Sequence, residues 1–462
     1  MNNIEECAKS ELDLFSVPPT QTSVIESSWD CIYPHPNFKN ATQIRFDIAG
    51  SNSHYLNLAE TELHMKCIMS DGTKGIGATD KVSAVNNFMH SLFEQIQVYI
   101  NNTPVENTNK LYQYKAYLEN LLCYGKEAKE TMLYNEGWVK DTAGKFDSLN
   151  LPVGDNERKT IIKQDAQKDV TVTTDNDYNE GFFLRHHRFS EKKVVQLCGK
   201  LHCDIFNTNR YMLNNVNIQI VLLKANAPFY LLAAETDTAA AQLTCTIDDI
   251  FLKVRRCSIS PSIMLAHAMA LEKTTAKYPI KRVLMKDIVI PYSARKFVLQ
   301  GVHTGVMPTR IVFGFLNNVA TSGALKLNPF NFQHLNLTQL LVKVANKLIP
   351  YQKSLNFAYD AAHKYGNSTA IEGYNSLFKN IREAPNDITF DDYCQGNTLY
   401  AFDLTPDQCS SNHYSLLKEG SLDIEFTFNA DIANSTSILF YMEFDNIIEI
   451  TKERNVIFDF KI

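Results

Sequence analysis

The pattern of apolar and polar positions changes twice within the stretch 85–125. Residues 95–100 alternate between apolar and polar side chains, and this period of two predicts a half-buried strand. Asn-Asn-Thr-Pro at 101–104 predicts a turn, since proline cannot donate to a strand ladder. From Leu111 onward the apolar spacing becomes helical. The stretch therefore predicts a strand, a tight turn and a helix in succession.

Alternation of the same kind recurs along most of the chain. Helical spacing is rarer and is expected at 111–124, at 260–271, where Ser260-Pro261 is a favourable start, near 352–364 and at 371–382. Many short strands with few helices indicate an all-β sandwich or barrel. The expected strands are 42–48, 63–69, 95–100, 201–206, 216–222, 243–254, 310–315, 340–344, 422–428, 437–444 and 456–462.

Segments without a clear period divide the chain. The polar N-terminal residues are expected to form a flexible arm, and the Asp-, Asn- and Thr-rich segment 137–181 a long surface loop. An Ala- and Thr-rich stretch that follows Pro228 is typical of a linker. The predicted organisation is an arm at 1–30, a first domain at 31–228, a linker at 229–241 and a second domain at 242–462.

Two features of the first half recur in the second. Residues 114–121 resemble 374–381 at helical spacing, and residues 199–206 resemble 420–427. Chance similarity between short apolar strings is the alternative explanation. A repeat of this length predicts two similar domains in one chain rather than a solenoid of short units.

Composition narrows the function. A chain of 462 residues is too long to fold around a single hydrophobic core, which favours two domains. The 45 basic and 51 acidic residues give it a net charge of −6. Proteins that neutralise phosphates carry the opposite balance, so we expect no sequence-specific nucleic-acid binding. The ten cysteines contain no C-x-x-C pair and are expected to be free thiols in a reducing compartment. We expect synthesis in the cytosol without a signal peptide, and no transmembrane segment.

No stretch predicts an active site. Ala143-Gly144-Lys145 lacks the upstream glycine of a phosphate-binding loop, and Gly366-Asn-Ser368 follows a helical pattern instead of the strand that a nucleophile elbow requires. His186 and His187 would point to opposite faces of a strand, which favours a basic patch over a metal site. His90 interrupts an apolar segment and is interpreted as structural. We therefore predict no catalytic, cofactor-binding or metal-binding residues and no enzymatic activity.

Ordered blocks of sequence resemble the major capsid proteins of Polinton/Maverick elements and their adintovirus-like relatives. The resemblance is carried by NNFMHSLFEQIQVYINNTPV, followed by YQYKAYLENLLCYG, and continues from about residue 30 to the end of the chain. Further blocks are FDIAGSNSHYLNLAETELHMKCIM (46–69), GKLHCDIFNTNRYMLNNVNIQIVLL (199–223), KYPIKR (277–282), MPTRIVFGFLNN (307–318), LNPFNFQHLNL (327–337), GNTLYAFDLTPD (396–407) and LFYMEFDNIIEITKERNVIFDF (439–460).

The resemblance implies a double jelly roll, meaning two tandem eight-stranded sandwiches with a few accessory helices. It also implies pseudo-hexagonal homotrimers that tile an icosahedral shell around a double-stranded DNA genome, so that the protein is located in the virion. Partners would be neighbouring capsomers and a penton or minor capsid protein with a single jelly roll. We expect the helices at 111–124 and 371–382 to pack beside the sheets and shape lateral contacts, and the arm to contact neighbours or inner proteins.

Two other classes of function remain open at this point. A carbohydrate- or ligand-binding module can use the same fold, and an enzyme can carry a site that one sequence does not reveal. The duplication, the absence of a cupin-like histidine set and the extent of the resemblance favour the shell protein.

Overall fold

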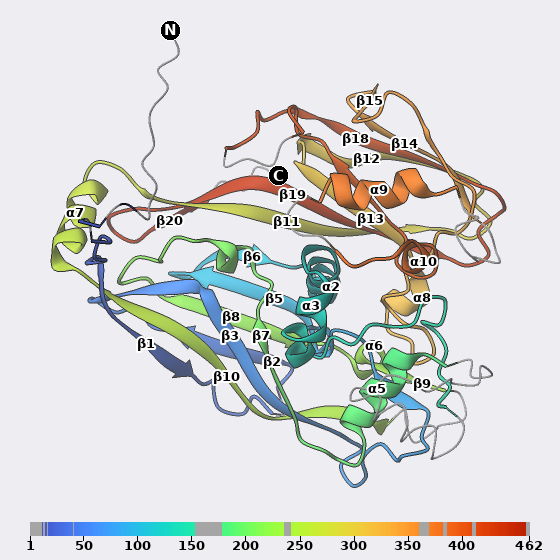
Figure 1. The fold of residues 1–462 in the computed structure, drawn as a ribbon, viewed down its shortest axis with the longest axis horizontal. Coiled ribbons are helices and arrows are strands. Elements are labelled where there is room, and N and C mark those ends of the chain that lie inside the picture. Colours follow the sequence, from blue (N-terminus) through green and yellow to red (C-terminus); the bar gives the residue numbers. More distant parts are fainter. Residues whose placement is uncertain are drawn as a thin grey trace.

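Two β-sandwiches lie one above the other, with their strands along the long axis of the molecule (Figure 1). The lower sandwich in that view comes from the first half of the chain and the upper one from the second half. The structure is a computed structural model that describes residues 12, 14–15, 17–39, 41–152, 178–234, 242–359, 369–381, 386–408 and 413–458.

The first sandwich has two four-stranded antiparallel sheets. Their orders are β1-β10-β3-β7 and β2-β8-β5-β6. A separate two-stranded sheet joins β4 to β9. The bounds are β1 Val24–Ile32, β2 Gln43–Ile48, β3 His54–Ser70, β4 Val82–Ala84, β5 Phe93–Ile100, β6 Thr103–Asn107, β7 Val195–Lys200, β8 Ile218–Lys224, β9 Leu231–Ala233 and β10 Thr244–Ile259.

The second sandwich repeats this arrangement. Its sheets follow the orders β11-β19-β13-β17 and β12-β18-β14-β15, with β20 added to β19 and β16 added to β14. The bounds are β11 Ala276–Ile290, β12 Lys296–Val306, β13 Arg310–Asn317, β14 Leu337–Val344, β15 Lys347–Leu348, β16 Leu355–Asn356, β17 Leu399–Asp403, β18 Glu419–Phe428, β19 Thr436–Ile450 and β20 Val456–Phe458.

The two halves share one topology. If the eight strands of the two four-stranded paths in each half are numbered along the chain, both halves give the orders 1-8-3-6 and 2-7-4-5. This is the jelly-roll order, in which the first and last strands are neighbours. The prediction of an all-β fold with two tandem eight-stranded jelly rolls is confirmed.

Period-two patterning explains the strands. In β2 the burial alternates strictly, and Ile44, Phe46 and Ile48 are at most 1% exposed. β18 alternates in the same way, with Ile424 and Phe426 fully buried. Each large apolar side chain buried in this way contributes roughly 1.5–3 kcal/mol, which makes the inward faces the main source of stability.

Sheet pairing corrects the expected boundaries. β10 was expected to open the second domain, but it pairs with both β1 and β3 of the first sandwich. β1 lies largely within the expected arm at 1–30, and the expected linker at 229–241 contains β9, while 235–241 lies outside the described residues. The reason is topological, because the last jelly-roll strand must return to the first one. An irregular segment before it therefore looks like a linker in sequence.

The opening stretch has the predicted form with one difference. β5 and α2 (Tyr112–Cys123) lie where a strand and a helix were expected. Pro104 was assigned to a turn but lies within β6, which is the edge strand of its sheet. A proline is tolerated there because its missing N–H faces away from the ladder. The turn is confined to Asn101 and Asn102, which both have positive φ.

One of the two internal similarities is structurally equivalent. α2 and α9 (Ile371–Lys379) both lie between the fifth and sixth strands of their sandwiches. The other similarity is wrong, since 199–206 covers the end of the sixth strand and η3 (Asp204–Asn207), whereas 420–427 lies in the seventh strand. The expected strand at 201–206 is accordingly absent, because a buried 3-10 turn can show the same short alternation. The helix expected near 352–364 is also wrong for residues 352–359, which contain the short strand β16, and 360–368 lie outside the described residues.

Most accessory helices lie toward one end of the sandwiches or beside them, and α7 (Pro261–Leu271) lies at the other end with the N-terminal arm (Figure 1). α7 connects the last strand of the first sandwich to the first strand of the second. The remaining helices are α1 Phe88–Ser91, α3 Lys126–Glu130, η2 Leu133–Glu136, α5 Glu180–Phe189, α6 Ala227–Tyr230, α8 Asn318–Thr321 and α10 Phe390–Cys394.

The expected surface loop at 137–181 is in part interior. Trp138 and Phe146 are each 3% exposed. The Asn328 side-chain amide donates to Asp141 at 3.2 Å, which links this segment to the second sandwich. Residues 153–177 lie outside the described residues. The polar composition misled the prediction, because these polar groups bond to the other domain instead of to water.

Candidate assembly surfaces

α7 is an apolar helix that packs on the core only through the half-buried side chains of Ile263, Met264 and Leu271. None of the residues in its sequence PSIMLAHAMAL is buried, and Leu265 and Met269 are 64% and 61% exposed. The helix starts at Pro261 as predicted, but the Ser260 hydroxyl hydrogen-bonds to Ser262 rather than capping the helix. A contiguous exposed apolar surface on a single chain is typical of an interaction site.

A groove of about 660 Å³ runs beside α7, between the first sandwich and the start of β11. Its apolar lining includes Leu213, Ile259 and Leu271, and basic side chains from Arg210 and Lys277 also line it. The rim is ordered by hydrogen bonds such as that between the Tyr55 hydroxyl and His267 Nδ1, at 3.0 Å. The groove therefore combines an apolar floor with positive charge.

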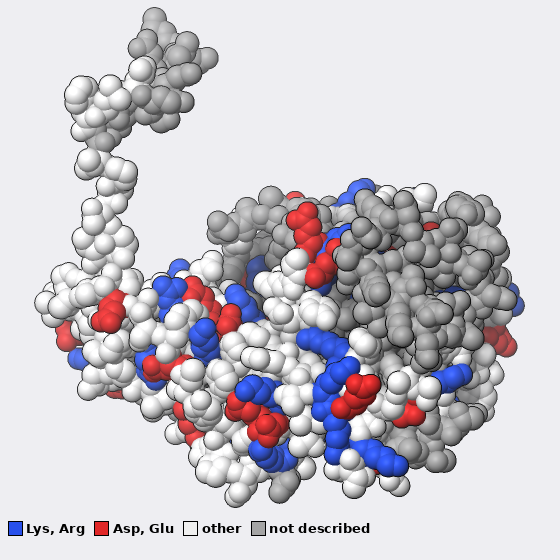
Figure 2. Space-filling view, turned by 60° about the horizontal axis from the view of Figure 1, so that its bottom comes forward, with Lys and Arg blue, Asp and Glu red and all other residues white. Residues whose placement is uncertain are grey.

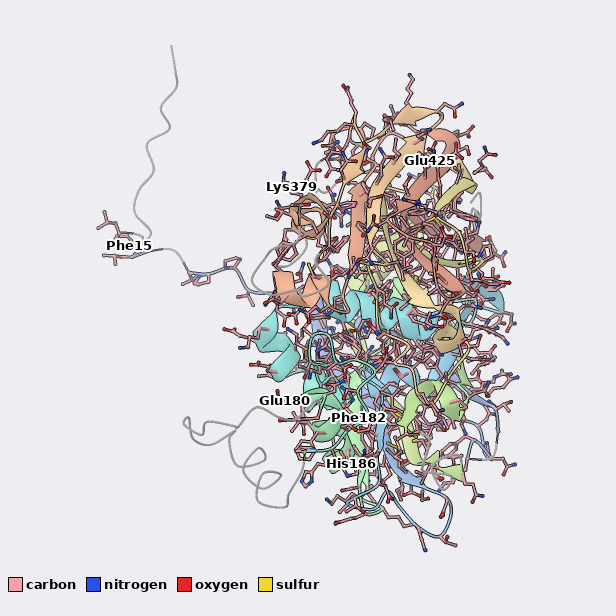
Figure 3. All side chains as sticks on the ribbon, turned by 90° about the vertical axis from the view of Figure 1, so that its right-hand side faces the viewer. Phe15, Glu180, Phe182, His186, Lys379 and Glu425 are labelled. Atoms are coloured by element: carbon pink, nitrogen blue, oxygen red, sulfur yellow. The ribbon has the colours of Figure 1, made fainter. Side chains whose placement is uncertain are left out.

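The N-terminal arm begins at the edge of this groove. Ser23 lines the groove, and its carbonyl accepts a hydrogen bond from the Ser260 N–H at 2.9 Å. Before it, Leu14 and Phe15 are 75% and 97% exposed, and the arm stands away from the body (Figures 2 and 3). A single chain thus leaves two apolar surfaces uncovered at the same end, the arm and α7.

The two sandwiches are joined by buried contacts. The Tyr117 ring of α2 stacks on Phe330 of the second half, with centroids 4.1 Å apart and planes 2° apart. At the margin of this junction, the half-exposed Lys140 pairs with the buried Asp392 at 2.6 Å. Lys129 is also paired with Asp387 across the junction. These contacts make the two sandwiches one block, which leaves α2 no free face for contacts between molecules.

The expectation that both helices shape lateral contacts is therefore wrong for α2. Ten of its twelve residues are buried within the chain. α9 has three buried residues out of nine, and its Ile371 and Phe378 are 57% and 38% exposed. Figure 3 shows Lys379, the last residue of α9, on the outer surface. Of the two, α9 retains a surface available to other molecules.

The groups considered for chemistry in the sequence have structural roles. His186 and His187 lie in α5 and not on a strand, and His186 Nδ1 bonds to the Val82 carbonyl at 2.8 Å. Arg185 is buried and pairs with Asp141 at 2.6 Å. Asp392 completes a capping box with Thr389 at the start of α10. Residues 366–368 lie outside the described residues.

The cysteines that the structure describes are all free thiols. Cys67, Cys203, Cys257 and Cys394 are buried, as expected for structural thiols, whereas Cys31 is exposed. Burial raises the pKa of Cys203 well above its usual value, which keeps this thiol protonated and unreactive.

A buried ion cluster lies beneath α2. Lys115 Nζ is 2.8 Å from Glu106 and 2.6 Å from Asp204, and all three side chains are at most 7% exposed. Burial opposes the charge on Lys115, but Asp204 and Glu106 hold its pKa well above the usual value. Burial and the nearby Asp204 raise the pKa of Glu106 to about 7. One ammonium thus faces two carboxyl groups, one of which titrates near neutrality.

A second buried polar cluster lies beside it and involves His90. His90 Nε2 is 3.1 Å from Glu136, and His90 Nδ1 is 2.8 Å from the Tyr112 hydroxyl. His202 Nδ1 is 2.6 Å from Glu119, and the rings of His90 and His202 are 4.7 Å apart. Burial lowers the pKa of His90. Sequence reasoning missed this cluster because its members are far apart in the chain.

A third group of potential ligands lies on the outer face of the first sandwich. His64 Nε2 is 3.1 Å from Glu62 and 3.4 Å from the Cys198 thiol. His64 also stacks on Phe251 with ring centroids 5.0 Å apart. Adjacent strands account for this grouping, since His64 and Cys198 are direct partners in the β3–β7 ladder.

No described helix is both long enough and apolar enough to cross a membrane. No protein-family model matches the chain. A Caenorhabditis elegans relative, uncharacterized protein F54H12.2, is 22% identical over 463 residues, which cover 96% of this chain and 99% of the relative.

Solved structures of viral capsids share the fold. The Sputnik virophage structure, from cryo-electron microscopy, matches with a TM-score of 0.61 and 9% identity and covers 100% of this chain and 94% of its own. The PBCV-1 capsid model matches with a TM-score of 0.56 and 8% identity, and the match covers 96% of this chain and 99% of the PBCV-1 chain. The mavirus major capsid protein matches with a TM-score of 0.51 and 12% identity, and the match covers 99% of this chain and 94% of the mavirus chain. The chain therefore has the double jelly-roll fold of viral major capsid proteins.

Proposed function

We propose that this chain is a viral major capsid protein of the Polinton/Maverick and adintovirus-like type. It forms pseudo-hexagonal homotrimers that tile an icosahedral shell around double-stranded DNA, together with a penton or minor capsid protein. The observation that carries the proposal is the shared strand order 1-8-3-6 and 2-7-4-5 in both halves of the chain. The likeness to viral capsid structures over nearly the whole chain supports it.

The duplicated topology suits a trimer with a hexagonal outline. Three chains with two similar sandwiches each place six similar wedges around a threefold axis, and such units pack with few gaps. The buried junction between the sandwiches, with Tyr117 stacked on Phe330, would keep the two wedges at a constant angle. We assign the first jelly roll to 24–259 and the second to 276–450, with α7 as the connection.

Assembly can use the two apolar surfaces left uncovered on each chain. We assign the groove beside α7 to the arm of a second copy, specifically Leu12, Leu14, Phe15 and Val17. Pro18-Pro19 lies between these residues and Ser23 and favours an extended backbone. At about 3.1 Å per residue, the spacer from Val17 to Ser23 then spans roughly 19 Å, which disfavours a return of the arm into the groove of its own chain.

Charge also fits this pairing. Glu11 and Asp13 lie on either side of Leu12 in the sequence of the arm, while Arg210 and Lys277 line the groove. Opposite charges at the ends of an apolar contact direct the register of docking more than they add affinity. The arm of one copy and the groove of another are therefore complementary in both apolar character and charge.

Electron microscopy of the purified protein tests the proposed function. Negative staining is expected to show trimers with a hexagonal outline, or closed shells. A monomer that binds a sugar on a glycan array would overturn the proposal and support the ligand-binding alternative, for which the groove beside α7 would be the site to examine.

A photo-crosslinker at Phe15 tests the arm. Chains labelled with heavy nitrogen are mixed with unlabelled chains before assembly, and the crosslinked peptides are then analysed by mass spectrometry. Links to α7 with mixed labels are expected. Exclusively unmixed labels would show that the arm binds its own chain, and links elsewhere would remove the groove as its site. A crosslinker at Leu416, which is 77% exposed, is the control.

A further inference from the structure

Three side chains from distant parts of the sequence form a ligand set in the interior of the first sandwich. His90 comes from α1, Glu136 from η2 and His202 from the segment after β7. One ligand atom from each lies within 4.8 Å of the other two, and all three residues are buried. Two imidazoles and a carboxylate are a ligand set that zinc accepts.

Unsatisfied polar atoms point to a missing partner at this cluster. The Nε2 atom of His202 is buried and has no hydrogen-bond partner, and the residue as a whole is only 9% exposed. Asn120, whose amide nitrogen lies 3.1 Å from Glu136, also leaves its Oδ1 buried without a partner. Leaving such buried atoms unpaired lowers the stability of the folded state, and a bound ion would use the free nitrogen of His202.

The surroundings of the cluster have the form of outer ligand support. His202 Nδ1 is bonded to the Glu119 carboxylate at 2.6 Å, which leaves Nε2 as the nitrogen available to an ion. His90 Nδ1 is bonded to the Tyr112 hydroxyl, and Glu136 receives the Asn120 amide. Carboxylates or hydroxyls on the second nitrogen of a ligating histidine fix its tautomer and orientation.

Distance and charge are compatible with one divalent ion. His90 Nε2 and Glu136 are 3.1 Å apart, near the roughly 3.3 Å edge of a tetrahedron with bonds of about 2.05 Å. The third ligand must then approach by up to about 1.5 Å, which a rotation of the His202 ring can supply. Two carboxylates, Glu119 and Glu136, would be balanced by a divalent cation.

We propose that His90, Glu136 and His202 bind one zinc ion, with a buried water as the fourth ligand, and that the ion fixes α1, η2 and the segment after β7 to one another. This is a structural site, since all three ligand residues are buried within the chain. The proposal does not depend on the capsid role and differs from our expectation from sequence that no metal ligands exist.

Metal analysis of the purified chain tests this site. Protein produced with zinc in the medium is expected to contain about one zinc ion per chain, measured by inductively coupled plasma mass spectrometry. The variants His202→Ala and Glu136→Gln are expected to lose this zinc. His303→Ala is the matched control, because His303 is similarly buried in the second sandwich and bonds to the Val306 carbonyl. Less than about 0.1 zinc in folded wild-type protein that also does not bind added zinc would overturn the proposal.

Cobalt substitution keeps the test decisive if these variants fail to fold. Wild-type protein freed of metal by a chelator is titrated with Co²⁺, and tetrahedral nitrogen and oxygen ligands are expected to give visible absorption without a thiolate charge-transfer band. A thiolate band that disappears in Cys198→Ser would instead assign the ion to Glu62, His64 and Cys198, and would overturn the proposal. Zinc is expected to raise Tm by more than about 3 °C at saturation.

Discussion

α2 and α9 occupy the same position in the two jelly rolls but face different surroundings. Each follows the fifth strand and precedes the sixth of its sandwich. α2 is enclosed, with Tyr117 against the second sandwich and Lys115 in a buried ion cluster. α9 keeps an exposed face that includes Ile371 and Phe378. A duplicated scaffold thus uses one copy of an insertion as an internal joint and the other as outer surface.

The largest expected effect comes from removing the cation beneath α2. Lys115→Met leaves Glu106 and Asp204 facing each other in the core, and we expect a loss of about 3–5 kcal/mol in the free energy of unfolding, measured by urea denaturation. The matched change in the α9 region is Lys353→Met, which breaks an exposed pair with Glu372 and is expected to cost under about 1 kcal/mol. Equal losses would remove the contrast between the two helices.

The next largest effect is expected at the ring stack between the sandwiches. Tyr117→Ala opens a cavity against Phe330 and is expected to cost roughly 3 kcal/mol in the same measurement. Phe378→Ala on α9 removes a partly exposed ring and is expected to cost about 1 kcal/mol. A smaller loss at Tyr117 than at Phe378 would show that the junction is not a principal source of stability.

The buried cluster also predicts a pH dependence. Because Glu106 has a pKa of about 7 in the folded chain and an ordinary value of 4.5 when unfolded, the folded state holds more protons between these values. Its contribution to stability is therefore present below about pH 4.5 and is lost as the pH rises toward 7 and above. Groups facing it are Lys115 and Asp204, with Arg282 nearby.

Glu106→Gln is expected to flatten this dependence. Urea midpoints for the wild type and the variant are measured from pH 5 to pH 8. The wild type is expected to lose stability relative to the variant as the pH rises across this range. Parallel curves would mean that Glu106 does not titrate there. Glu372→Gln, at an exposed position of α9, serves as the control.

The smallest effect on stability is expected on the exposed face of α9. Ile371→Glu is expected to change the free energy of unfolding by less than about 0.5 kcal/mol, since this side chain is 57% exposed. On the proposed function it should instead weaken association between trimers, measured by light scattering during assembly. Normal assembly would leave α9 without a role in lateral contacts, and Leu416→Glu tests whether any added surface charge acts similarly.

Local patterns predicted the elements better than their pairing. β2 and β18 alternate strictly because one face is buried, so a period of two identified them directly. The helical spacing of 111–124 identified α2 for a similar reason. Which strands become neighbours depends on contacts between distant residues, and β10 was accordingly placed in the wrong domain. The internal similarity between 114–121 and 374–381 indicated the duplication, and the resemblance to capsid proteins supplied the eight-stranded jelly roll as the repeated unit.

Polar residues were the least predictable part. Asp141 and Asn328 bond to each other across 187 positions of sequence, so the segment around Asp141 had the composition of a surface loop although it is buried. His90 and His202 are brought together in the same way, by folding alone. Charge and polarity in one stretch reveal a need for partners but not where those partners come from.

The strand order has a consequence for direction. In an antiparallel jelly roll, connections from odd to even strands fall at one end and connections from even to odd strands at the other. The arm and α7 both belong to the second kind, and most accessory helices to the first (Figure 1). The alternation of strand direction alone thus makes the two ends of the molecule different. A layer of such chains in the same orientation would therefore have two different surfaces. One surface would carry most of the accessory helices, and the other would carry the arm and α7.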